Sequence, residues 1–157
     1  VMPRIEEDEY DTAKDKLMMD VNVTGCMAWL NPAAERFGKL GSGTIVGISS
    51  VAGDRGRKGA PAYCASKAAV TTYMESLRNR LGMRGVDVIT IKPGPVATPM
   101  TDGLDGLPML IQVEDAAEQI WAGIAARANV RYVPRQWQPI MTLIRHIPSV
   151  LFRRLGI

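Results

Sequence analysis

The sequence predicts an α/β protein that forms the C-terminal part of a doubly wound, parallel-sheet, Rossmann-like domain. Residues 44–49 are rich in β-branched side chains and lack polar alternation, which is typical of a buried parallel strand. Residues 86–91 and 130–133 have the composition of two further short strands. Helical patterns over 61–81 and 113–127 separate these runs, and such alternation predicts βαβ units with right-handed crossovers.

Each predicted helix has its own boundary signals. Apolar residues recur at helical spacing over 8–30, and Pro32 and Gly38 are expected to break or end this region. A second helix is expected to begin at Pro61 and to run to residue 81, where two glycines close it. A third is expected over 113–127, with the following side chains directed inward: Ala116, Ile120, Trp121 and Ile124.

The last segment, 136–157, is basic and amphipathic, and we separate it from the partial Rossmann-like domain over 1–135. Pro148 is expected to split it into two helices. An apolar face beside a basic face is typical of a helix at an anionic lipid surface. The alternative is a core or subunit-contact helix whose arginines extend outward. The residues concerned are Ile140, Ile144, Ile147, Leu151 and Leu155, with Arg145, His146, Arg153 and Arg154 among them.

Composition limits the class of protein. A length of 157 residues and 46% hydrophobic residues suffice for one domain with a core. The two cysteines, Cys26 and Cys64, are too few for a disulfide framework and are interpreted as reduced thiols in a cytoplasmic protein. The net charge of +3 arises near the C-terminus, without the basic face interleaved with aromatics that nucleic acid would require. No cluster of histidine, cysteine and carboxylate predicts a metal site.

The chemistry is expected at the start of the second helix, where Tyr63 and Lys67 lie four residues apart on one face. A free phenol, with a pKa of about 10, is a poor acid–base catalyst at neutral pH. A nearby ammonium favours the phenolate and is expected to lower that pKa. Tyr63 could then give a proton to a carbonyl oxygen or take one from an alcohol.

Ser50 is the third candidate. It directly follows the first predicted strand and lies 13 residues before Tyr63. Ligands of open α/β sheets bind beyond the carboxyl ends of the strands, so the Ser50 hydroxyl is expected to reach the same substrate oxygen as Tyr63. By itself a Tyr-x-x-x-Lys pair occurs by chance on many helices; its position after this serine is what favours an active site.

Four segments resemble the short-chain dehydrogenase/reductase family in its compact branch, in order and in spacing. They are Asp20-Val21-Asn22-Val23-Thr24-Gly25, the run from Gly43 to Gly53, Tyr63-Cys64-Ala65-Ser66-Lys67, and the run from Lys92 to Thr98. The resemblance is close from Asn22 to about Met100 and loose on the flanks. It implies an NAD- or NADP-dependent oxidoreductase that interconverts a ketone or aldehyde and an alcohol.

The resemblance also implies roles for single residues. Tyr63 would be the general acid/base, Lys67 would lower its pKa and hold the nicotinamide ribose, and Ser50 would position the substrate oxygen. Asn22, at a helix irregularity, would hold a water that links Lys67 to solvent. Pro93, Gly94, Val96 and Thr98 would contact the nicotinamide carboxamide. The protein supplies the proton and the orientation, while the hydride belongs to the cofactor.

The sequence departs from the family at its start. The opening strand and the glycine-rich phosphate-binding loop are not found, and the glycines from Gly38 to Gly47 precede or interrupt a strand rather than follow one. We therefore expect a fragment of a longer enzyme that alone binds dinucleotide poorly and is inactive. The residue that selects NAD or NADP is also missing. The edge of the strand over 44–49 is expected to be left open and apolar.

The substrate side is expected in the loops over 51–60 and 95–111. The second loop is apolar, which suggests a hydrophobic ketone or alcohol; equally, its side chains could simply pack on the helices. His146 is interpreted as interfacial and not catalytic. Two alternatives remain open: the family's branch that modifies nucleotide sugars, and a non-catalytic binding or scaffold protein. The family also implies a homo-oligomer paired through long helices.

Overall fold

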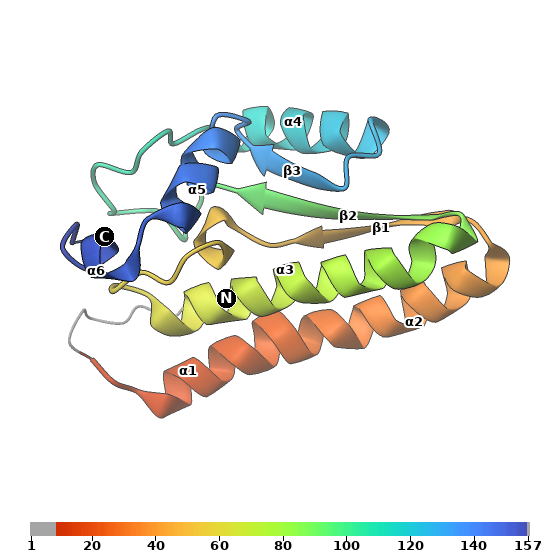
Figure 1. Ribbon diagram of the computed structural model, residues 1–157, viewed down its shortest axis with the longest axis horizontal. Helices are drawn as coiled ribbons and strands as arrows, with labels where there is room; N and C mark the ends of the chain where they lie inside the picture. The colour runs from red at the N-terminus through yellow and green to blue at the C-terminus, as the bar shows by residue number, and fades with distance from the viewer. Residues whose placement is uncertain (1–8, 157) are drawn as a thin grey trace.

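The computed structural model describes residues 9–156, which form a three-stranded parallel sheet in the order β1-β2-β3 with helices on both faces (Figure 1). The strands are β1 (Gly43–Ile48), β2 (Val86–Pro93) and β3 (Val130–Val133). β1 pairs with β2 from Gly43↔Val86 to Ile48↔Ile91, and β2 pairs with β3 through Thr90↔Val130 to Pro93↔Val133. This confirms the predicted α/β class and all three strands.

The two faces of the sheet have separate cores because successive side chains of β2 point in opposite directions. Val86 and Val88 pack with residues of α2 (Cys26–Leu40) and α3 (Pro61–Leu81). Ile89 and Ile91 pack with residues of α4 (Val113–Ala125). Figure 1 shows α2 and α3 on one side of the sheet and α4 on the other. β2 is therefore the buried centre, and in the described part of the chain β1 pairs only on its β2 side.

The first helical region is longer than expected. It comprises α1 (Thr12–Met19), a π-helical stretch η1 (Asp20–Gly25) and α2, which continues past Pro32 and Gly38 to end at Leu40. The expected break was therefore wrong. A proline inside a helix costs about 3 kcal/mol, but Leu30, Ala33, Ala34 and Phe37 pack against the α3 core. The helix ends instead at Gly41, whose φ of 69° is in the left-handed region that favours glycine.

The inward position expected for Trp121 was also wrong, because its side chain is 70% exposed. The inner face of α4 is formed by Ala116, Ile120 and Ile124, which pack with β2 and β3. Trp121 follows Ile120 and is turned by about 100° around the helix axis from it. Trp121 is apolar and adjoins an inward-facing position, so the sequence pattern included it although it lies outside the buried face of α4.

The remaining elements lie close to their expected bounds. α3 has Pro61 in its first turn and is capped at Gly82, and the 3-10 turns η2 (Val51–Gly53) and η3 (Gly82–Arg84) flank it. Pro148 separates α5 (Trp137–His146) from α6 (Ser149–Phe152), which confirms the predicted split. No helix over residues 9–156 has the length and apolarity to cross a bilayer.

Candidate active site

The candidate site lies where β1 ends and α3 begins, at the carboxyl edge of the sheet. Ser50 caps η2: its Oγ accepts a hydrogen bond from the Ala52 N–H at 3.1 Å. The same hydroxyl donates to the Pro93 carbonyl oxygen at the end of β2, at 3.3 Å. One serine thus contacts the loops that follow two neighbouring strands.

Tyr63 and Lys67 project from one face of α3, as their spacing predicts. The Lys67 Nζ lies 5.8 Å from the centroid of the Tyr63 ring and donates to the Ile48 carbonyl oxygen at 3.2 Å. Burial lowers the pKa of Lys67, and the neighbouring Cys26 opposes this effect. The ammonium group is therefore held between the end of β1 and the face of the phenol ring.

The pKa of Tyr63 is raised by burial, whereas the sequence predicted a lower one. A hydrogen bond with the Ser50 hydroxyl and the charge of Arg57 act in the opposite direction but do not cancel the burial. Lys67 approaches the ring face and the β1 carbonyl, a geometry that the spacing alone could not specify. The effect of Ser50 on this pKa indicates that the serine hydroxyl lies near the phenol.

Asn22 lies in the π-helical stretch η1, so the predicted helix irregularity is confirmed. Its side chain is buried, and Nδ2 donates to the Ser66 Oγ at 3.2 Å. Ser66 in turn donates to the Tyr63 carbonyl oxygen at 2.8 Å. A short polar chain thus connects η1 to the turn of α3 that carries Tyr63 and Lys67.

The four residues predicted to contact the cofactor lie at the end of β2 (Pro93) and in the loop that follows it (Gly94, Val96 and Thr98). The Gly94 N–H donates to the Val133 carbonyl oxygen at 2.8 Å, and Val96 forms a parallel bridge with Ile111. That bridge uses the Ala97 and Ile111 N–H groups, while the Val96 carbonyl accepts from Thr101. The Val96 N–H has no hydrogen-bond acceptor among residues 9–156. The Thr98 N–H donates to Thr101 Oγ1 at 3.0 Å, which orders the far end of the loop.

Two close contacts at the site were not predicted. A Cβ on Gly53 would lie 2.7 Å from the Lys67 carbonyl carbon, and one on Gly94 would lie 2.0 Å from Trp137 Nε1. A buried ion pair between Asp54 and Lys92 also joins the two loops. A lysine near the end of a mostly apolar strand was the one sequence signal for this pair; nothing in the sequence indicated its partner.

The sequence model of the short chain dehydrogenase family matches residues 3–106, which is about two thirds of the chain. The chain belongs to the short chain dehydrogenase family. The match includes Asn22, Ser50, Tyr63, Lys67 and the loop from Pro93 to Thr98, so every predicted site residue lies inside the family region.

Curated relatives of this short chain dehydrogenase are oxidoreductases. An uncharacterized oxidoreductase of Myxococcus xanthus is 37% identical over 136 residues, which are 86% of this chain and 54% of the relative. A 3-oxoacyl-[acyl-carrier-protein] reductase of Synechocystis is 37% identical over 93 residues, 59% of this chain and 38% of that protein. The chain spans about half the length of the relatives that it matches over most of its own length.

Solved structures show the same fold. A short chain dehydrogenase from Burkholderia cenocepacia in complex with NADP has a TM-score of 0.82 at 24% identity, and covers 96% of this chain and 62% of its own. A short-chain dehydrogenase from Sphingobium yanoikuyae in complex with NADPH has a TM-score of 0.74 at 24% identity, over 89% of this chain and 59% of its own. These likenesses establish the Rossmann-like fold of the described chain.

The apolar loop of this short chain dehydrogenase divides between the two expected roles. Val96 and Ile111 pack on the α4 core, and Met109 packs on a cluster formed by Val51, Tyr132, Trp137 and Met141. Met100, Leu104 and Leu110 are each nearly half exposed. The loop therefore contributes some side chains to the packed clusters and leaves others exposed.

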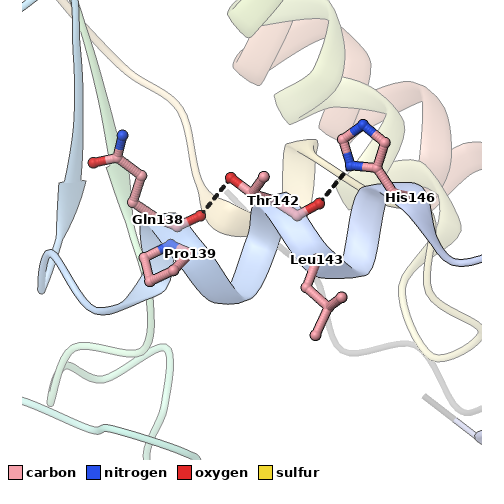
Figure 2. A pocket seen from close by; sticks show the side chains of 5 residues that line it. All are labelled: Gln138, Pro139, Thr142, Leu143 and His146. Carbon is pink, nitrogen blue, oxygen red and sulfur yellow. Dashed lines mark hydrogen bonds between the residues drawn. The ribbon is translucent and has the colours of Figure 1, made fainter.

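Two cavities of the short chain dehydrogenase lie beside α5, and neither includes Ser50, Tyr63 or Lys67. The open one, about 600 Å³, is lined by Gln138, Pro139, Thr142, Leu143 and His146 (Figure 2). In it the His146 Nδ1 hydrogen-bonds the Thr142 carbonyl oxygen, so the imidazole is engaged with its own helix. A second, polar cavity of about 460 Å³ is lined by residues of α3, β2, β3 and α5, together with Gly53 and Asp54.

Proposed function

We propose that this chain carries the proton-transfer residues of an NAD(P)-dependent oxidoreductase that interconverts a ketone or aldehyde and an alcohol. The observation that supports the proposal is the meeting of Ser50, Tyr63 and Lys67 at the carboxyl edge of the sheet. A buried phenol beside a hydroxyl and an ammonium is a group that can donate and regain one proton.

In reduction, the Tyr63 hydroxyl donates its proton to the carbonyl oxygen of the substrate, and in oxidation the phenolate takes it back. Ser50 donates a hydrogen bond to the same oxygen after leaving Pro93, whose 3.3 Å bond is long and easily exchanged. The Lys67 ammonium stabilises the phenolate that remains. Asn22 and Ser66 hold the first turns of α3 in place through the Tyr63 carbonyl.

The loop after β2 fits a nicotinamide carboxamide. The Val96 N–H is a backbone donor without an acceptor in the described part of the chain, and Gly94 allows close approach of the backbone. Pro93 and Thr98 bound this segment, and Lys67 and Tyr63 offer donors to ribose hydroxyls. When bound, the nicotinamide supplies or accepts the hydride. NADP is the first cofactor to test, since the Burkholderia structure contains it, and NAD is the second.

A label-transfer assay tests the proposal. It uses the intact protein, which here means the longer enzyme of which this chain is expected to be a fragment. We expect a deuteride carried by NADPH or NADH to appear on the carbinol carbon when hydrophobic ketones and aldehydes are supplied. Cofactor binding without transfer to any of them would favour the alternative of a non-catalytic binding or scaffold protein. Oxidation or epimerisation of a nucleotide sugar instead would move the substrate class to the other branch.

A second proposal concerns the end of the chain, which we suggest contacts an anionic membrane surface. Trp137, Met141 and Phe152 are buried, so part of the segment belongs to the core. Leu143, Val150, Leu151 and Leu155 are each more than half exposed, and Arg153 and Arg154 lie among them. Exposed apolar side chains beside arginines are the combination that interfacial binding requires.

Homo-oligomer formation is proposed from family membership. On α2 the Trp29 side chain is 84% exposed, on a helix that packs by its other face against α3. A large exposed aromatic residue is typical of a protein interface. Light scattering of the intact protein and of Trp29→Glu measures the mass directly; an unchanged mass in the variant would remove this surface from the interface.

A further inference from the structure

The ladder of hydrogen bonds between β1 and β2 stops just before the candidate catalytic residues. Its last bond runs from the Ser49 N–H to the Ile91 carbonyl oxygen at 2.8 Å. Beyond it, the Ser50 hydroxyl donates a 3.3 Å hydrogen bond to the carbonyl oxygen of Pro93, the last residue of β2, which Gly94 follows. A bond of this length fixes the separation of two loops only weakly.

A buried ion pair also joins the end of β2 to the segment that follows Ser50. Lys92 directly precedes Pro93, Asp54 lies four residues after Ser50, and the Lys92 Nζ is paired with Asp54 Oδ1. The side chains are 4% and 2% exposed, so the pair is shielded from solvent. Its attraction is therefore much less screened by water and salt than that of a surface pair.

Tyr132 completes the cluster from β3. It is the register partner of Lys92 across the sheet, and its hydroxyl donates to Asp54 Oδ2 at 2.6 Å. Its ring lies 5.4 Å from the Lys92 Nζ, within cation–π range. Burial, followed by the hydrogen bond to Asp54 and its charge, raises the pKa of Tyr132, so the hydroxyl stays a donor. Both carboxylate oxygens of Asp54 are thus held in place.

We propose that Asp54, Lys92 and Tyr132 are positioning residues that set the distance between the Ser50 loop and the loop of Pro93 and Gly94. The inference rests on the proposed function for its catalytic consequence, but its structural part is independent of it. A buried pair contributes little net stability compared with a well-packed apolar pair, and its best-supported use is to specify one arrangement. Here that arrangement is the relative placement of the candidate serine and the candidate cofactor loop.

The test compares Asp54→Asn, Lys92→Met and the double variant with Lys39→Met as control. Lys39 pairs with Glu35 on the exposed surface of α2, and its loss should change nothing measurable. Each single variant leaves one buried charge without its partner and should lower Tm by about 10 °C. The double variant removes both charges and should regain most of that loss.

The deciding readout in the double variant is local. Amide exchange at Ala52, Gly53 and Asp54 should be at least about tenfold faster than in the parent, because the ion pair no longer ties this segment to β2. Exchange at Cys64 in α3 should stay unchanged, and kcat/KM should remain at least about tenfold below the parent despite the recovered Tm. Recovery of both kcat/KM and loop exchange together with Tm would reduce the pair to a purely structural feature and overturn the inference.

Tyr132→Phe covers the case in which the double variant fails to regain Tm. This variant keeps both charges and removes one hydrogen bond to Asp54, so the fold should persist. Exchange at the η2 amides should still rise at least about threefold; parental exchange rates would overturn the inference. Absence of turnover on any carbonyl in the intact parent protein would refute the proposed function, while amide exchange would still decide the inference.

Discussion

The Lys67 Nζ donates to the Ile48 carbonyl oxygen, and this contact connects the candidate active site to the last residue of β1. The ammonium lies over the face of the Tyr63 ring, at 5.8 Å from its centroid, while burial raises the pKa of the phenol. Tyr63 therefore stays protonated up to a higher pH than a free tyrosine. The protonated phenol is the form that donates a proton to a carbonyl in the proposed function.

The first prediction concerns the titration of Tyr63. A group whose folded pKa is raised stays protonated up to a higher pH, so Tyr63 should not ionise below its ordinary value of about 10. The tyrosinate absorbance of the parent minus that of Tyr63→Phe should develop only above pH 10. Arg57→Gln should move it higher still, because Arg57 lowers the pKa. A Tyr63 signal near pH 7 would contradict this geometry.

The second prediction concerns Gly53, which allows η2 to pack against α3. In Gly53→Ala the new Cβ would lie 2.7 Å from the Lys67 carbonyl carbon and 2.9 Å from the Ala68 nitrogen, both rigid backbone atoms. We expect a loss of about 1–3 kcal/mol in the free energy of unfolding. Gly56→Ala is the matched control, with nothing within 4 Å of its Cβ. Equal denaturant midpoints for the two variants would show that the contact does not matter.

The third prediction tests the packing of Trp137 on the candidate cofactor loop. Gly94→Ala would place a Cβ 2.0 Å from Trp137 Nε1, which is buried and has no hydrogen-bond partner among residues 9–156. We expect Gly94→Ala to destabilise by about 1–3 kcal/mol, and Trp137→Phe to relieve part of that cost in the double variant. Strict additivity in chemical denaturation would mean that the two residues are not coupled.

The sequence predicted the positions of the helices and strands better than the tertiary contacts that these elements make. The hydrophobic pattern and the glycine and proline residues at element ends predicted β1, β2, β3 and α3. Each of these elements has a characteristic composition and a glycine or proline near a boundary. The pattern failed at Pro32, where packing of α2 outweighs a local propensity, and at Trp121, where neighbouring helix positions differ in burial. Both failures arise from tertiary contacts that a window of sequence does not contain.

The site shows the same division. Spacing and family resemblance placed Ser50, Tyr63 and Lys67 together, and the helix irregularity at Asn22 was confirmed. The direction of the Tyr63 pKa shift was not predictable, since it depends on the burial of the phenol and on which acceptor the Lys67 ammonium bonds. Asp54 and Lys92 are 38 residues apart in the sequence, so their pairing emerges only when β1 and β2 are placed side by side.

The fourth prediction concerns lipid. The intact protein should co-sediment with vesicles that contain anionic phosphatidylglycerol, and Leu151→Ser with Leu155→Ser should reduce the bound fraction severalfold. Met83→Ser is the control, since Met83 is fully exposed elsewhere, in η3. Equal binding of parent and double variant, or no binding of the parent, would leave the segment as an ordinary core and contact helix.

Proton transfer by Tyr63 is tested most directly by comparing Tyr63→Phe with Tyr73→Phe in the intact protein. Both tyrosines lie on α3, and Tyr73 bonds Asn31 on α2, away from the candidate site. We predict that Tyr63→Phe lowers kcat for carbonyl reduction by at least about a hundredfold, with the Kd for NADPH nearly unchanged, while Tyr73→Phe keeps parental kcat. Parental turnover in Tyr63→Phe would contradict the account.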